Sequence, residues 1–207
     1  MDYKIVSGAV TGATVLLLGL IWLGIAAFFL VRKRKTPGYV LLFTIFYIYL
    51  YKVLDYTLFE FQSLLIIKHF VPGLMLKGLK AGESLNLIPL VRLTPGDIKT
   101  SLLNVLLMLP FGFGLPFITN FRMKRVVAAG MLFSIAIEFL QLITGSMAGM
   151  TFRVADINDV IFNTAGAAAG YILFAAFLRI YRRAFRNWEV GSMPVLQYIA
   201  ERPQVDE

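Results

Sequence analysis

The stretch "FRVADINDVIFNTAG", from Phe152 to Gly166, places one arginine, two aspartates and two asparagines directly before an apolar run that ends in a row of arginines. An apolar run of about 20 residues is typical of a transmembrane helix. Ionisable residues are costly inside a membrane, and those found there usually have a function. We therefore predict that these polar residues form one wall of a polar site near the outer membrane surface.

The rest of the chain has the composition of an integral membrane protein. Of its 207 residues, 58% are hydrophobic and 15% are charged, whereas soluble domains carry about 25% charged residues. The net charge of +8 comes from basic clusters beside long apolar runs, "RKRK" (32–35), "RMKR" (122–125) and "RIYRRAFR" (179–186). Such clusters are typical of cytoplasmic loops and not of a nucleic-acid-binding face. The sequence has no cysteine, which excludes disulfides, thiolate metal sites and cysteine nucleophiles.

Five apolar runs are candidates to cross the membrane as helices. They are Gly8–Val31, Tyr39–Leu54, Ile98–Phe117, Val126–Ile143 and Val160–Ile180. Their continuous apolarity favours helices over barrel strands, in which apolar and polar residues alternate. We predict an all-α membrane protein, a bundle of about five transmembrane helices in the cell membrane. Within the last run, "GAAAG" (166–170) is a small-residue pattern that lets helices pack closely.

The basic clusters all fall on one side of the membrane if all five segments span it. The positive-inside rule then places the N-terminus outside and the C-terminus in the cytoplasm. The predicted organisation is two N-terminal helices in residues 1–56, an extracytoplasmic loop with an amphipathic segment in 57–97, a three-helix core in 98–187 and a polar, mobile tail in 188–207.

Three of the predicted helices carry polar residues at nearly the same outer depth, and their inner halves are almost purely apolar. Spacings of three, four and seven residues place the polar side chains of one helix on one face. A carboxylate within the membrane costs about 2.5–3.5 kcal/mol and normally faces the bundle interior. We therefore predict one shared site, capped by the 57–97 loop, in which Arg153 or Arg92 could neutralise an acid. The candidate residues are Asn104, Glu138, Gln141, Arg153, Asp156, Asp159 and Asn163.

These residues also have purely structural interpretations. Asp156 and Asp159 match a helix N-cap followed by an acid in the first turn. Asn104 and Gln141 could serve only as hydrogen bonds between helices. Glu138 is the least easily explained in this way, because an amide would make the same contact at lower cost.

The residue types limit the chemistry without selecting one reaction. A single histidine and the lack of cysteine disfavour nucleophile triads and zinc hydrolysis. Paired carboxylates could act as general acid and base, or hold a divalent cation against a phosphate. The same set could equally bind hydroxyls, amides or a lipid head group without reacting. The sequence leads us to assign no metal and no cofactor.

The C-terminal half contains four motifs in a fixed order, and together they resemble the VanZ-like family of bacterial membrane proteins. The motifs are "NLIPL" (86–90), "NVLLMLPFGFGLP" (104–116), "SIAIEFLQL" (134–142) and "RVADINDVIFNTAGAAAGY" (153–171). The resemblance implies a link to resistance against the lipoglycopeptide teicoplanin in Gram-positive bacteria, and it adds Asn86 to the candidate site. It implies no demonstrated cofactor or catalytic residue.

The leading hypothesis is recognition of a cell-envelope molecule at the outer leaflet, with a membrane lipid, a lipid-linked envelope precursor or a lipoglycopeptide as the partner. The alternative is a carboxylate-dependent membrane enzyme that acts on a lipid-linked envelope intermediate. A transporter or lipid translocase is disfavoured, because the inner halves of the helices lack a polar path.

Overall fold

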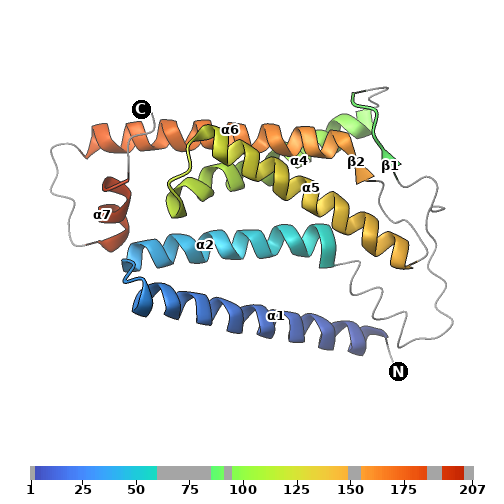
Figure 1. The fold of residues 1–207 in the computed structure, drawn as a ribbon, viewed down its shortest axis with the longest axis horizontal. Coiled ribbons are helices and arrows are strands. Elements are labelled where there is room, and N and C mark those ends of the chain that lie inside the picture. Colours follow the sequence, from blue (N-terminus) through green and yellow to red (C-terminus); the bar gives the residue numbers. More distant parts are fainter. Residues whose placement is uncertain (1–2, 60–84, 91–94, 149–154, 186–192, 203–207) are drawn as a thin grey trace.

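The computed structural model describes residues 3–59, 85–90, 95–148, 155–185 and 193–202. Within these ranges, five helices are long and apolar enough to cross a membrane, which confirms the predicted five-helix membrane bundle (Figure 1). These helices are α1 (Tyr3–Ala27), α2 (Pro37–Leu54), α4 (Pro95–Ile118), α5 (Met123–Ala148) and α6 (Ile157–Ala184). Their direction across the membrane stays a prediction.

Two of the helices are lengthened by single π-helical segments. The segment η1 (Phe28–Arg32) continues α1 as far as the first basic cluster, and η2 (Asp55–Phe59) continues α2. The second helix begins at a typical N-cap, because the Thr36 side chain accepts a hydrogen bond from the Tyr39 N–H at 3.3 Å and a proline follows it. The predicted run Tyr39–Leu54 is therefore a helix, and it begins two residues earlier, at Pro37.

The centre of the bundle is the contact between α4 and α6, where glycines let the two backbones meet. A Cβ atom on Gly112 would lie 1.9 Å from the Ala167 carbonyl oxygen, and one on Gly170 would lie 2.0 Å from that of Leu109. Any larger residue would force the helices apart. The small-residue pattern thus acts in packing within the chain, and it aligns the first turns of α4 with those of α6.

Helix α1 lies at one edge of the bundle, beside α2 (Figure 1). Trp22 Nε1 donates to Thr44 Oγ1 at 3.1 Å, and the Tyr47 hydroxyl donates to the Leu18 carbonyl oxygen at 2.8 Å. Most side chains of its described part, from Gly12 onward, are exposed on the molecule. Lipid is the natural neighbour of such a surface in a membrane.

The C-terminal segment differs from the mobile tail that the sequence suggested. Residues 194–200 form the helix α7 (Pro194–Ala200), and Ile199 is buried in the core. The Tyr198 hydroxyl donates to the Phe117 carbonyl oxygen at 2.6 Å, and Arg202 donates to the carbonyl oxygens of Pro116 and Thr119. The last carbonyls of a helix lack partners within it, and the tail docks because it supplies them.

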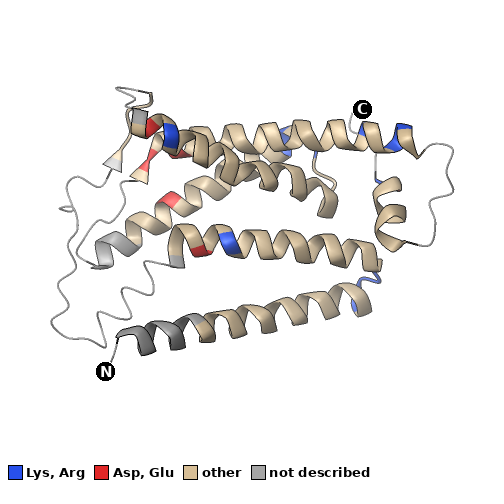
Figure 2. Cartoon of the chain, turned by 180° about the vertical axis from the view of Figure 1, so that it is seen from behind, with Lys and Arg blue, Asp and Glu red and all other residues tan. Residues whose placement is uncertain are grey.

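Charge is segregated along the bundle axis, as Figure 2 shows. The end closed by α7 carries the basic residues of the α1–α2 connection and Arg182 and Arg183 at the end of α6. Most of the acids drawn lie at the other end, where α4 and α6 begin and α5 ends. By the positive-inside rule, the end that carries most of the basic residues is expected to face the cytoplasm.

Candidate functional site

The site is built around the residue that starts α6. Asp156 is the N-cap of this helix, and its Oδ1 accepts a hydrogen bond from the Asn158 N–H at 2.8 Å. The same Oδ1 accepts from Asn86 Nδ2 at 3.1 Å, and the Asp156 N–H donates to Glu138 Oε2 at 3.2 Å. The capping interpretation is therefore correct, and the cap also joins α5 and the segment around Asn86.

Residues 85–90, hereafter the clasp, lie over the start of α6. The strand β1 (Leu85–Asn86) pairs in parallel with β2 (Ala155–Asp156), with Asn86 opposite Asp156. Asn86 Oδ1 then accepts from the Ile88 N–H at 3.1 Å, and Asn158 Oδ1 accepts from the Leu90 N–H at 2.8 Å. Side-chain amides thus hold a short non-helical segment that is about 70 residues away in the sequence from its partner.

Hydrogen bonds also connect the three helices of the predicted core. Asn104 Nδ2 of α4 donates to Asp159 Oδ1 of α6 at 2.6 Å. Glu138 of α5, which is 9% exposed, reaches the backbone at Asp156. Asn163 Nδ2 of α6 donates to Ser134 Oγ of α5 at 2.8 Å. The predicted junction of three polar helix faces at one end of the bundle is therefore present.

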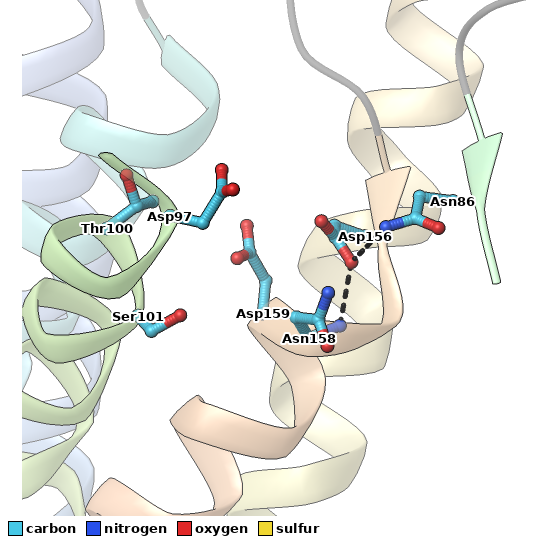
Figure 3. A pocket seen from close by; sticks show the side chains of 7 residues that line it. All are labelled: Asn86, Asp97, Thr100, Ser101, Asp156, Asn158 and Asp159. Atoms are coloured by element: carbon cyan, nitrogen blue, oxygen red, sulfur yellow. Dashed lines mark hydrogen bonds between the residues drawn. The ribbon is translucent and has the colours of Figure 1, made fainter. Parts of the chain in front are cut away.

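A polar pocket of about 150 Å³ opens between the clasp, the first turns of α4 and the start of α6 (Figure 3). The carboxylates of Asp97 and Asp159 face the same space from α4 and α6. All of its described lining residues are aspartates, asparagines or hydroxyl residues: Asn86, Asp97, Thr100, Ser101, Asp156, Asn158 and Asp159. Such a lining offers mainly acceptor oxygens, so it suits a ligand that carries hydroxyl or amino donors.

The predicted site residues separate into groups by position. Asn86, Asp156 and Asp159 line the pocket, while Asn104 and Glu138 support it through the hydrogen bonds given above. That these residues bind a ligand stays a prediction.

Gln141 and Asn163 are not among the described lining residues of the pocket. Gln141 Nε2 donates to the Thr57 carbonyl oxygen in η2 at 2.9 Å. Asn163 lies between α5 and α6, and its Oδ1 is buried without a hydrogen-bond partner among the described residues. Arg153 and Arg92, the predicted neutralising cations, lie outside the described residues.

Four lining residues were absent from the sequence-based set: Asp97, Thr100, Ser101 and Asn158. The first three precede Asn104 by seven, four and three residues, so these three side chains share one face of α4 with Asn104. This spacing is visible in the sequence, but the predicted apolar run began at Ile98, three residues after α4 itself begins. Asn158 belongs to the opening stretch, 152–166, but it was not among the candidate residues, because its role, accepting from the distant Leu90 N–H, has no local signature.

Comparison with known proteins identifies the chain's relatives at the level of a family. Residues 56–179, more than half of the chain, match the VanZ/LLP1 family. The matched region includes the clasp and the whole described lining of the pocket. No curated protein and no solved structure matches the chain.

Proposed function

Because the chain belongs to the VanZ/LLP1 family and has five candidate membrane-spanning helices, we propose that its pocket binds the polar head group of a membrane-anchored cell-envelope molecule. The supporting observation is the lining, which combines carboxylates with amide and hydroxyl oxygens. These groups accept hydrogen bonds from sugar hydroxyls and from amino groups. A bare phosphate would meet Asp97, Asp156 and Asp159, so a head group rich in hydroxyls or amines fits better.

The size of the pocket limits what enters it. Its volume is about 150 Å³, whereas pockets that enclose a drug-sized ligand have about 300–1,000 Å³. One sugar ring or one small amine-bearing head group is therefore the appropriate occupant. A lipoglycopeptide such as teicoplanin would engage through one sugar only. The proposed link to lipoglycopeptide resistance is that the pocket binds either the antibiotic's sugar or an envelope molecule on which the antibiotic acts.

The proposed location is the outer leaflet, because the pocket lies at the end of the bundle opposite most of the basic residues (Figure 2). A reporter fused after Arg186 should read cytoplasmic, and one inserted near Gly78 should read external. The reverse result would place the pocket at the cytoplasmic face and contradict an outer-leaflet role.

The proposal is tested by binding of defined lipids to the full chain. Nanodiscs would contain glycosyldiacylglycerol, lysyl-phosphatidylglycerol or phosphatidylglycerol, and bound lipid would be counted by native mass spectrometry. We expect one of the first two to bind better than phosphatidylglycerol. Asp159→Asn should weaken that binding about tenfold or more, since a hydrogen bond to a charged group contributes about 1.5–3 kcal/mol.

Asp55→Asn is the matched control for this test. Asp55 forms an ion pair with Lys52 at 3.3 Å, and the two side chains are 38% and 67% exposed. Such pairs contribute little to stability, so this variant should bind like the unmodified chain. Equal binding of all three lipids, unaffected by Asp159→Asn, would refute the proposal.

A membrane enzyme is the second candidate, and one observation favours it. Asp97 and Asp159 face the same space (Figure 3), as a general acid and a general base would. In that case Asp97→Asn or Asp159→Asn should abolish release of the head group from a glycosylated lipid, while binding of the intact lipid persists. Unchanged lipid after prolonged incubation with the unmodified chain, together with specific binding, would favour the binding function.

A further inference from the structure

The clasp exposes large apolar side chains directly beside the polar pocket. Leu87, Ile88 and Leu90 are 65%, 63% and 55% exposed. Asn86, at the start of the same segment, lines the pocket. One short segment therefore presents a polar residue to the pocket and an apolar surface away from it.

The backbone of the clasp is suited to a medium without water. Ile88 and Leu90 donate their N–H groups to the side-chain oxygens of Asn86 and Asn158, and Pro89 has no N–H. Non-helical backbone at membrane depth requires such internal partners, because lipid supplies none. In water these donors would need no side-chain acceptor, so the two asparagines have a specific use if the clasp lies in the membrane.

The apolar surface of the clasp has a counterpart on the neighbouring helix. Ile98, Leu102 and Leu106 of α4 are 57%, 58% and 53% exposed. A spacing of four residues places them on one stripe of the helix. Another face of the same turns carries Thr100 and Ser101, which line the pocket. An outward-facing apolar surface of a candidate membrane span thus extends up to the level of the pocket.

We propose that the clasp inserts its apolar side chains into the membrane leaflet beside the pocket, so that the ligand enters laterally from the bilayer. This inference rests on the proposed binding function and narrows the ligand class. The head group would be bound while its lipid chains stay in the leaflet next to Leu87 and Ile88. A water-soluble head group of the same chemistry would lack this anchor and bind more weakly.

The depth of the clasp can be measured directly, because the chain has no native cysteine. Single-cysteine variants Leu87→Cys and Ile88→Cys would be labelled with a nitroxide in nanodiscs of phosphatidylcholine and phosphatidylglycerol. Collision with oxygen, which partitions into lipid, would be compared with collision with a water-soluble nickel chelate. Leu106→Cys, on the α4 stripe, is the lipid reference, and Asn120→Cys, exposed in the α4–α5 connection, is the aqueous reference.

We expect the labels at Leu87 and Ile88 to resemble the label at Leu106, with oxygen favoured over the nickel chelate. Labels that resemble the one at Asn120 would refute insertion. Labels shielded from both reagents would mean that protein, such as a second copy of the chain, covers the clasp, and would also refute it. No ligand is present in this measurement, so its failure leaves the binding function to be judged by the Asp159→Asn experiment.

A second arm tests lateral entry. Glucosylglycerol, the soluble head group, would compete with glycosyldiacylglycerol for the chain in the same nanodiscs. We expect at least a tenfold excess of the soluble compound over the membrane-anchored one to be needed for half displacement. Equal potency would refute entry from the bilayer.

Discussion

The two ends of α4 are both held by polar side chains, but among the described residues the polar pocket lies at the end where α4 begins. At the basic end, Arg202 and Tyr198 donate to the last carbonyls of α4, and aromatic rings pack around the contact. At the pocket end, Asp156 caps α6, yet Asp97 and Asp159 still face a cavity. The first arrangement only closes a helix end, whereas the second also lines a polar pocket, and it is this pocket that we propose binds the head group.

The largest effect is expected at the contact between α4 and α6, which lies between the two ends of α4. Gly112→Ala would place a Cβ atom 1.9 Å from the Ala167 carbonyl oxygen, which can be relieved only by moving a backbone. We expect the free energy of unfolding to fall by about 1–3 kcal/mol or more, and head-group binding to fall with it. Thermal unfolding of the detergent-solubilised chain would measure this loss.

Gly19→Ala in α1 is the matched control, because nothing lies within 4 Å of the added Cβ. Alanine is favoured over glycine within a helix by about 0.5–1 kcal/mol. This variant should be as stable as the unmodified chain or slightly more so. If both glycine variants unfolded at the same temperature, the close contact of α4 with α6 would not hold the bundle together.

The second-largest effect should distinguish the basic end of α4, which contributes to stability, from the pocket end, which we propose binds the head group. Arg202→Ala removes a charged donor from the carbonyl oxygens of Pro116 and Thr119, and such bonds contribute about 1.5–3 kcal/mol. Burial raises the pKa of the Tyr198 hydroxyl, so that group stays protonated and keeps its bond to Phe117 at neutral pH. We therefore expect a lower unfolding temperature with unchanged head-group binding.

Arg183→Ala, an exposed substitution at the same end of the molecule, serves as the control for Arg202→Ala and should change neither quantity. A parallel loss of binding in Arg202→Ala would show that the two ends are coupled through α4. The contrast between a structural end and a binding end would then be wrong.

The sequence predicted those features that depend on local patterns. Long apolar runs indicated the five helices, and "ADIND" indicated the cap at Asp156, because a side-chain acceptor before a helix has a fixed local geometry. Polar contacts of Asn104 with Asp159 and of Glu138 with the start of α6 were also expected, since charged and amide groups at one membrane depth need partners inside the bundle. Each of these inferences uses residues within one helix or one common depth.

The features that the sequence did not predict depend on distant partners. The pairing of Asn86 with Asp156 joins segments 70 residues apart, and its two-residue strands carry no periodicity. Gln141 shares a helix face with Glu138 by spacing, but its partner is the Thr57 carbonyl oxygen of η2. The docking of α7 depends on the free carbonyls at the end of α4, which no pattern within residues 193–202 reveals.

A smaller effect distinguishes capping from ligand binding at Asp156. Asp156→Ala removes the cap and should lower the free energy of unfolding by about 1 kcal/mol. Asp156→Ser keeps a capping oxygen, so it should retain most of the stability. The shorter side chain should lose its contact with Asn86, loosen the clasp and weaken head-group binding. Equal binding by Asp156→Ser and the unmodified chain would mean that Asp156 is only a cap.

The smallest effect concerns Gln141, which the sequence placed in the site and the structure joins to η2. Gln141→Leu removes its bond to the Thr57 carbonyl oxygen, and interhelical bonds of this kind contribute on average about 0.6 kcal/mol. We expect a slight fall in the unfolding temperature and unchanged binding of glycosyldiacylglycerol. Asn104→Leu is the matched comparison, because it removes a similar amide that bonds to Asp159 at 2.6 Å; it should lower both stability and binding. If Gln141→Leu weakened binding as strongly as Asn104→Leu, the polar site would extend from the pocket to η2, and the boundary drawn between pocket residues and interhelical bonds would have to move.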